Sequence, residues 1–312
     1  MDASFAASLR CPRCSAPVSG NAETLVCSGC GAHYPVRSGV PRMLPDSDPA
    51  QERTADAFSY QWREFTEMHP EYRDQFLDWI HPLDPEFFEG KRVLDAGCGI
   101  GRHAWFAAEF GASEVVALDL SEAVETAEQV LASRPNAHVV QGDLLRPPFE
   151  EESFDLVYSI GVLDHLPDTA AGIESLARLV RPGGTLFVWV YGYEGNTAVR
   201  LAIDPLRRLT SRIDPRVLRV IAFPLAAGFH LASRLARTPL GRVLPLRDYL
   251  RSVSRFSFRQ NENIVFDQLV SPTVRYVRRE ELERWLRDAG LERLEITDRN
   301  GNSWRGRGCR PE

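Results

Sequence analysis

The stretch VLDAGCGIGRH, Val93–His103, decides the fold, because three glycines crowd the turn that follows a short apolar run. Residues 91–97 predict a buried strand, and residues 102–110 have the composition of a helix. A dinucleotide site would carry the spacing G-x-G-x-x-G, whereas this turn has G-x-G-x-G and places Arg102 where the last glycine would stand. Glycine lets the backbone approach a ligand closely, and Asp95 can accept hydrogen bonds from an ammonium group or orient the turn. The turn therefore favours a cationic, amino-acid-like ligand over a diphosphate.

Two further apolar runs end in acidic residues that we expect at the same edge of a parallel sheet. The run SEVVALDLS, residues 113–121, contains Asp119, which lies eighteen residues beyond Gly101. A carboxylate at this place can accept hydrogen bonds from both hydroxyls of a ribose. The run AHVVQGDLL, residues 137–145, contains Asp143 at a place where its carboxylate can accept a hydrogen bond from the exocyclic amine of an adenine. Acids at three successive strand ends together match an adenosyl amino acid.

Five segments extend the pattern in a fixed order within residues 93–190: VLDAGCGIG, ALDLS, QGDLLRPPF, SFDLVYSIGVLDHLPD and LVRPGGTLFVWV. In these segments the chain resembles class I S-adenosylmethionine-dependent methyltransferases of the kind called methyltransferase type 11. The resemblance implies an α/β fold with a Rossmann-like seven-stranded sheet and helices on both faces. It also implies S-adenosylmethionine as the cofactor.

The same resemblance implies which residues hold that cofactor. Asp95, Gly97 and Gly99 would hold its methionine portion, and Gly101 would open the following helix. The residues that would meet the ribose and adenine are Asp119, Leu120, Asp143 and Leu144. The residues that would border the methyl-transfer site are Ser159, Ile160 or Gly161.

A neutral phenol or alcohol must lose a proton when it accepts a methyl group, so the site needs a base. His165, directly after Asp164, is the first candidate, because histidine is the usual proton acceptor at neutral pH. Tyr191 and Glu194, just past the fifth expected strand, are alternative candidates. Each also has a plain interpretation: Asp164 and His165 could open a helix or pack beside the cofactor, and the other two could be loop side chains. The upstream segment FSYQW, residues 58–62, would either lay an aromatic ring over the cofactor or pack on the core.

Four cysteines near the N-terminus form two C-x2-C pairs separated by twelve residues: Cys11, Cys14, Cys27 and Cys30. Four thiolates on two tight turns are the ligand set of a structural zinc ion. Redox cysteines, buried thiols and His33 as a competing ligand are the alternatives. The set resembles short zinc-ribbon domains that are fused to or partnered with methyltransferases. A module of about 45 residues has too small a core to fold without the metal.

Residues 199–277 form an insertion with an unusual charge pattern. Its first part, residues 199–260, contains 13 arginines against Asp204, Asp214 and Asp248. Apolar residues recur every three or four positions, which predicts amphipathic helices, and we expect five prolines to divide them into short pieces. The insertion is interpreted as an amphipathic helical cap. In the plain interpretation, its apolar stripe docks on the domain and its arginines face solvent. In the functional interpretations, it is a lid over an anionic or lipid-like acceptor, or it lies against a membrane surface. Its longest uncharged run, residues 220–233, is shorter than the roughly 20 residues of a spanning helix.

We therefore expect a zinc ribbon at 1–45, a linker and N-terminal helices at 46–90, a cofactor-binding core at 91–198, the cap at 199–277, and a helix and strands completing the core at 278–312. The expected function is methyl transfer from S-adenosylmethionine to an oxygen or nitrogen of a small or lipid-linked acceptor. An RNA methyltransferase is the second hypothesis and a non-catalytic cofactor-binding subunit the third. Nucleic acid is disfavoured by the acidic excess outside the cap. No secretory signal is visible, so we expect a cytoplasmic protein.

Overall fold

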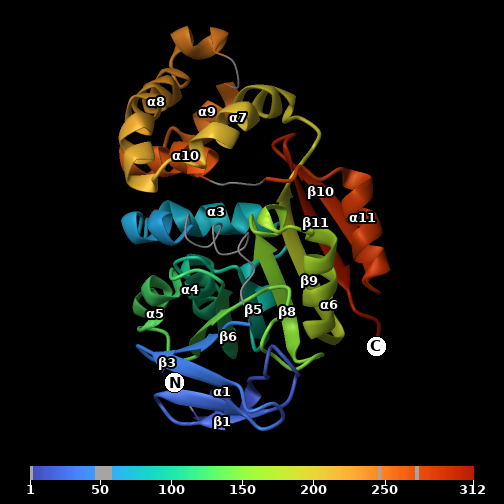
Figure 1. The fold of residues 1–312 in the computed structure, drawn as a ribbon. Helices are drawn as coiled ribbons and strands as arrows, with labels where there is room; N and C mark the ends of the chain where they lie inside the picture. Colours follow the sequence, from blue (N-terminus) through green and yellow to red (C-terminus); the bar gives the residue numbers. More distant parts are fainter. Residues whose placement is uncertain (1–2, 46–57, 245–246, 271–273) are drawn as a thin grey trace.

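A computed structural model describes residues 3–45, 58–244, 247–270 and 274–312. The linker expected around residues 46–56 lies outside these residues. Figure 1 shows a central sheet, a small N-terminal module at one end (blue) and a helical cap at the opposite end (yellow to orange).

The central sheet has the strand order of the expected fold. Its parallel strands are β5 (Arg92–Ala96), β6 (Glu114–Asp119), β7 (Ala137–Gly142), β8 (Phe154–Ile160) and β9 (Val180–Tyr191). The hairpin of β10 (Glu292–Arg299) and β11 (Ser303–Cys309) pairs antiparallel with β9. The order β7-β6-β5-β8-β9-β11-β10 confirms the seven-stranded core.

Helices cover both faces of this core because alternate strand residues point to opposite sides. Val93 of β5 belongs to the apolar cluster under α3 (Glu71–Ile80), α4 (Arg102–Glu109) and α5 (Val124–Leu131). Its neighbour Leu94 belongs to the cluster under α6 (Thr169–Leu179) and α11 (Arg279–Asp288). Both strand residues are fully buried, as parallel strands covered on two faces require.

The N-terminal module extends the core sheet, which the sequence did not predict. It contains α1 (Ala3–Ser8), β1 (Val18–Gly20), β2 (Thr24–Cys27), β3 (His33–Arg37) and β4 (Val40–Met43). Strand β4 pairs parallel with β7, so that all four small strands and the seven core strands form one eleven-stranded sheet. The ring of Phe5 stacks on His138 of β7 with centroids 4.2 Å apart.

Arg42 ties this module to the core at the β4–β7 junction. Its side chain is 5% exposed and donates to Oε1 of Gln141 at 3.0 Å and to Glu125 at 3.0 Å. Gln141 in turn donates to the backbone carbonyl of Leu120 at 3.0 Å. A buried guanidinium is therefore matched by acceptors from β7 and α5.

The cap consists of α7 (Thr197–Thr210), α8 (Pro215–Leu235), the short 3-10 helix η3 (Pro239–Val243), α9 (Arg247–Val253) and α10 (Phe258–Val270). Leu218 and Ala222 of α8 and Phe266 of α10 form a small apolar core with Phe65. This arrangement corrects one expectation, because Pro205 lies inside α7 and Pro224 inside α8, and neither proline divides its helix. The φ angle of proline is compatible with a helix, and packing of the flanking turns on α10 offsets the lost hydrogen bond.

Helix α8 also corrects the expectation about length. It has 21 residues, and by length and composition it could cross a membrane. Only 22% of its most apolar window is buried within the protein. The uncharged run in the sequence is shorter than the helix because Arg219 precedes it. Arg219 forms ion pairs with Glu262 and Glu64, so this charge faces the protein.

Candidate functional site

The glycine turn between β5 and α4 adopts backbone conformations that require glycine. Gly97 has φ +90°, and Gly101, with φ +77°, is the residue that opens α4. A methyl group at Gly97 would overlap the side chain of Val162. The amides of Gly97 and Cys98 donate to the carbonyl of Leu118 at 2.7 and 2.9 Å, which fixes the turn against the end of β6.

Asp119 stands at the end of β6 and binds the same turn. Its Oδ2 accepts from the amide of Gly99 at 2.8 Å, and its Oδ1 accepts from the amide and hydroxyl of Ser121 at 2.8 and 2.6 Å. Burial raises the pKa of Asp119, whereas the hydrogen bonds from Ser121 and Gly99 act in the opposite direction. Three of the roughly four acceptor sites of this carboxylate are thus used, and Oδ2 retains one for a further donor.

Asp143 follows β7 and reaches the same edge of the sheet. Its side chain is buried, and Oδ1 accepts from the amide of Leu145 at 2.9 Å. Asp143 and Leu144 line one cavity together with Asp119, Leu120 and the glycine turn.

Asp95 and Ser159, by contrast, lie behind the turn and do not line this cavity. Ser159 is fully buried and donates to the carbonyl of Ala96 at 2.8 Å, so it braces β5 against β8. Asp95 is 1% exposed, and its Oδ2 has no hydrogen-bond partner among the described residues. Burial raises the pKa of Asp95 to about 7. This orphaned acceptor under a bare glycine turn fits a ligand that brings an ammonium group.

The cavity has a volume of about 1210 Å³ and extends from the glycine turn to the cap. Its cap end is lined by apolar and aromatic side chains together with polar groups, namely Leu206, Leu225, Phe229, Tyr249, Val253, Phe256 and Gln268. A cavity of this kind, apolar with a few convergent polar groups, is typical of small-molecule sites.

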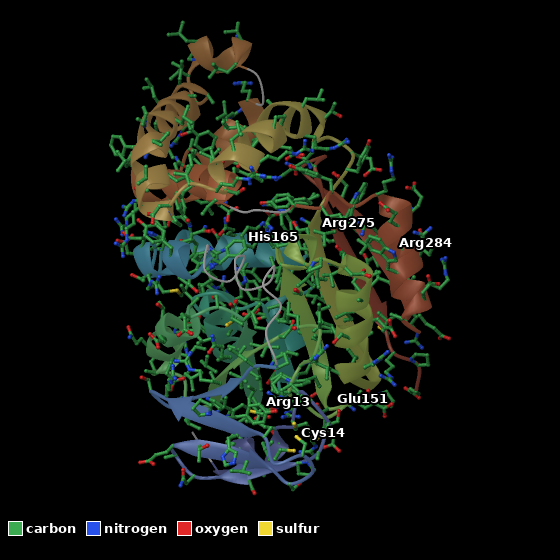
Figure 2. All side chains as sticks on the ribbon, in the orientation of Figure 1. Arg13, Cys14, Glu151, His165, Arg275 and Arg284 are labelled. Carbon is green, nitrogen blue, oxygen red and sulfur yellow. The ribbon has the colours of Figure 1, made fainter. Side chains whose placement is uncertain are left out.

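The candidate bases differ in where their side chains lie. His165, the last residue of the 3-10 helix η2 (Leu163–His165), lines the cavity and lies between core and cap (Figure 2). Its ring meets the ring of Phe58 edge-on, with centroids 5.1 Å apart. Tyr191 also lines the cavity, and its hydroxyl lies 3.5 Å from Nε2 of Gln268. Burial raises the pKa of Tyr191 well above its ordinary value, so its hydroxyl stays protonated. Glu194 instead accepts from Nε1 of Trp304 at 3.1 Å, is exposed and does not line the cavity.

Three cavity residues were not singled out as site residues from the sequence. Trp62 lies over the glycine turn, with its ring 3.2 Å from where a Cβ of Gly99 would be. The guanidinium of Arg102 stacks on the rings of Trp62, Tyr72 and Trp79 within 5.6 Å of each centroid. Asp267 of α10 accepts from Gln61 at 3.1 Å. The aromatic segment at 58–62 was the available signal for Trp62, whereas Asp267 lies in an insertion with no motif.

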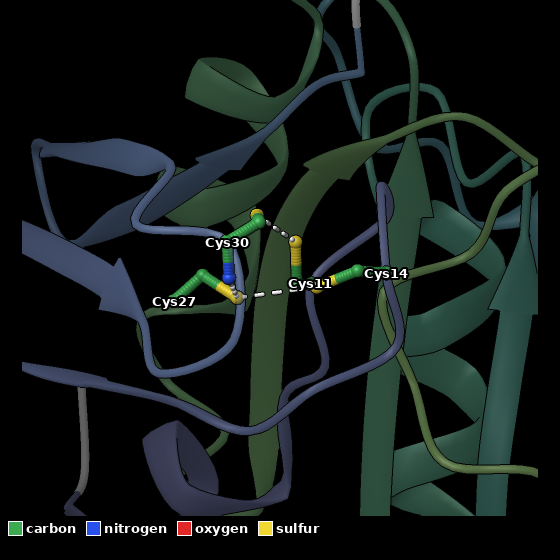
Figure 3. A group of neighbouring side chains, drawn as sticks. All are labelled: Cys11, Cys14, Cys27 and Cys30. Carbon is green, nitrogen blue, oxygen red and sulfur yellow. Dashed lines mark hydrogen bonds between the residues drawn. The ribbon is translucent and has the colours of Figure 1, made fainter.

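The four paired cysteines converge in the N-terminal module (Figure 3). Their sulfur atoms all lie within 4.8 Å of one another, with Cys14 and Cys27 at 3.4 Å and Cys11 and Cys30 at 3.7 Å. A tetrahedral zinc site with Zn–S bonds of about 2.3 Å holds its sulfurs about 3.8 Å apart, so the donor set fits this metal. The amides of Cys30 and Gly29 donate to Sγ of Cys27 and lower the pKa of that thiol to about 6. His33 is exposed and is not part of the cluster.

Comparisons with known proteins agree with this geometry. Residues 94–188 match the family model described as "Methyltransferase domain". The chloroplastic tocopherol O-methyltransferase of Arabidopsis thaliana is 34% identical over 120 residues, which are 37% of this chain and 34% of that protein. The ubiquinone biosynthesis O-methyltransferase of Paracidovorax citrulli is 34% identical over 148 residues, 45% of this chain and 60% of that protein. The matches thus span less than two thirds of these relatives.

Among solved structures, Haemonchus contortus phosphoethanolamine N-methyltransferase 2, in complex with phosphomonomethylethanolamine and S-adenosylhomocysteine, superposes with a TM-score of 0.50. The alignment covers 87% of this chain and 62% of that chain at 16% identity, so the likeness is one of fold. Together, the family match and the strand order support a class I S-adenosylmethionine-dependent methyltransferase domain at residues 94–188.

Proposed function

We propose that the protein transfers a methyl group from S-adenosylmethionine to an oxygen of an apolar, lipid-linked small molecule. The observation that carries the proposal is one continuous cavity of about 1210 Å³, which begins at the glycine turn and the two strand-end acids and ends among apolar cap residues. One end of the cavity thus offers hydrogen-bond acceptors to a nucleoside. The other end offers an apolar wall to the molecule that receives the methyl group.

The residues that would hold the cofactor are those at the carboxyl ends of β5, β6 and β7. Gly97 and Gly99 would lie along its methionine portion with Asp95 beneath, Asp119 would accept from the ribose, and Asp143 would accept from the adenine amine. The sulfonium of this cofactor supplies an electrophilic methyl group. The contribution of the chain is to align an acceptor oxygen with that methyl and to exclude water.

His165 is the residue that we assign to proton removal from the acceptor oxygen. It lines the cavity beside the cofactor end, and its ring is steadied by Phe58. The protonated hydroxyl of Tyr191 is better suited to hydrogen-bond the acceptor than to take its proton. A positioned base contributes about 100-fold to 10,000-fold to the rate.

The apolar cap end of the cavity and the names of the relatives favour a prenylated or otherwise lipid-linked phenol as acceptor. Tocopherol and ubiquinone appear in the names of the two relatives, and both are ring compounds with a long apolar tail. Exposed apolar residues on the cap argue against nucleic acid, the second candidate acceptor, because phosphate backbones are bound by charged and polar groups.

Calorimetry with S-adenosylmethionine and S-adenosylhomocysteine tests the cofactor, and transfer of a labelled methyl group to prenylated phenols tests the reaction. His165→Asn should lower the transfer rate at least about 100-fold and leave cofactor affinity unchanged. Glu194→Gln is the matched control, since Glu194 faces Trp304 and should be neutral. Binding of a nicotinamide or flavin in place of the adenosyl cofactor would reject the proposal.

We also propose that residues 1–45 form a structural zinc ribbon and that residues 199–277 form the cap. Residues 278–312 supply the helix and strands that complete the core. The four-cysteine cluster supports the first of these assignments. Metal analysis of the purified chain should find about one zinc per chain. A stoichiometry near zero in folded protein would reject the ribbon.

A further inference from the structure

The outer surface of the cap is apolar where a surface helix is normally polar. Of the thirteen large hydrophobic side chains that are clearly exposed among the described residues, eleven lie between Leu201 and Val243. The inner face of α8 is formed by Leu218, Ala222, Ala226 and Ser233, which are buried. Its opposite face carries residues that share a helical stripe, namely Val217, Val220, Ile221, Pro224 and Leu231.

The 3-10 helix that follows α8 also exposes large apolar side chains. Leu240 and Val243 of η3 are 75% and 88% exposed, and Val220 and Leu231 of α8 are 74% and 69% exposed. Such a concentration of exposed large apolar side chains in one part of the cap is typical of an interaction surface. We call Val217, Val220, Ile221, Leu231, Leu240 and Val243 the outer apolar face.

Arginines without acidic partners lie in the same part of the cap as the outer apolar face. Five exposed arginines on or beside α7, α8 and η3 make no ion pair within the described part of the chain: Arg208, Arg212, Arg216, Arg237 and Arg242. The acids of this region are engaged elsewhere, since Asp204 binds Arg207 at 2.9 Å and Asp214 caps the amide of Arg216 at 2.8 Å. Apolar side chains flanked by unpaired cations are the pattern of a helix that lies in a membrane interface.

The cap end of the cavity includes apolar side chains that are partly exposed. Leu206 of α7 and Leu225 of α8 line the cavity and are also 38% and 53% exposed. Because Leu225 belongs to α8, the helix that carries most of the outer apolar face, an acceptor with an apolar tail could pass from a lipid phase into the cavity without crossing water.

We infer that the cap docks on an anionic phospholipid surface through the outer apolar face, with its arginines at the level of the lipid phosphates. The entry route rests on the proposed function, whereas the docking itself does not. The 22% burial of α8 and the inward ion pairs of Arg219 place this helix on the protein surface and in the plane of the interface, not across the bilayer.

The test is co-sedimentation of the full chain with vesicles of phosphatidylcholine, with and without phosphatidylglycerol. The chain should bind the anionic vesicles, and binding should weaken as salt is raised. Val220→Glu combined with Leu231→Glu should lower partitioning at least about 100-fold, because each buried side chain contributes about tenfold. Arg208, Arg212 and Arg216 changed together to Gln should also lower it about 100-fold, at about fivefold per cation.

Met68→Glu is the matched control, because Met68 is an exposed apolar residue outside the cap and should not affect vesicle binding. Cofactor affinity is measured on every variant, and it should stay at the wild-type value. If the wild type binds cofactor but not anionic vesicles, the docking inference fails and the proposed function stands. If vesicles bind but the cofactor does not, the proposed function fails alone. If Val220→Glu with Leu231→Glu instead converts a dimer into monomers in analytical sedimentation, the face is covered by a second copy and the inference is wrong.

Discussion

Replacing Asp95 by asparagine should change how the stability of the protein depends on pH. Asp95 is fully buried, one of its oxygens has no hydrogen-bond partner in the described structure, and burial raises its pKa to about 7. An aspartate in an unfolded chain has a pKa of about 3.9. The folded state therefore binds a proton at this site over a pH range in which the unfolded state does not.

The sign and size of the effect follow from this difference. A carboxyl whose pKa is raised by folding contributes most stability below about pH 4 and loses that contribution as the pH rises toward 7. About three units at 1.36 kcal/mol per unit amount to about 4 kcal/mol. An asparagine side chain cannot ionise, so the Asp95→Asn variant lacks this loss and carries only a constant, pH-independent cost for the amide.

The assay is urea unfolding of wild type and variant at intervals from pH 4 to pH 8. The variant should gain about 4 kcal/mol relative to wild type between pH 4 and pH 7 and little above that. Asp74→Asn is the control, because Asp74 is exposed on α3 and should leave the curve parallel to that of wild type. Saturating cofactor should reduce the difference, since an ammonium near Asp95 favours the ionised form. Parallel curves for Asp95→Asn and wild type would refute the reasoning.

Three further changes test the site and its support. Asp119→Ala should weaken binding of S-adenosylmethionine by at least about 1 to 3 kcal/mol in calorimetry, because a charged acceptor is removed from its donors; unchanged affinity would reject the ribose assignment. Trp62→Ala should weaken cofactor binding about tenfold without lowering the thermal midpoint, if the ring covers the glycine turn as a lid. Arg42→Ala should lower the free energy of unfolding by about 2 kcal/mol, because Gln141 and Glu125 lose their donor, and an unchanged urea midpoint would contradict this.

The parts of the site that depend on strand ends could be predicted from sequence. A glycine turn after a strand, and acids at the ends of the next two strands, are local patterns, and parallel strands bring their carboxyl ends to one edge. The structure accordingly gathers Gly97, Gly99, Asp119 and Asp143 around one cavity. Side-chain direction was harder to predict. Ser159 bonds to Ala96 behind the turn, because strand residues alternate between faces and one position decides which face is reached.

Contacts between distant segments could not be predicted in the same way. Arg42 lies 99 positions from Gln141, and nothing local in either segment indicates that β4 will pair with β7. The continuity of α8 through Pro224 depends likewise on its packing against α10, which overrides a local helix breaker. The cap side of the cavity has no motif, because apolar lining residues resemble ordinary core residues in sequence.

The pairing of β4 with β7 places the N-terminal module beside the strand that leads to Asp143 at the cavity. Without β4, strand β7 would end the sheet with its backbone groups unpaired, and edge strands are the least restrained part of a sheet. Arg42 on β4 donates a hydrogen bond to Gln141, and Gln141 donates one to the carbonyl of Leu120. Leu120 directly follows Asp119, and Gln141 lies two residues before Asp143. A metal in the four-cysteine cluster would therefore act on cofactor binding through strand pairing and not through contact. The strands of the cysteine module and the strands that end at the cofactor cavity belong to one sheet.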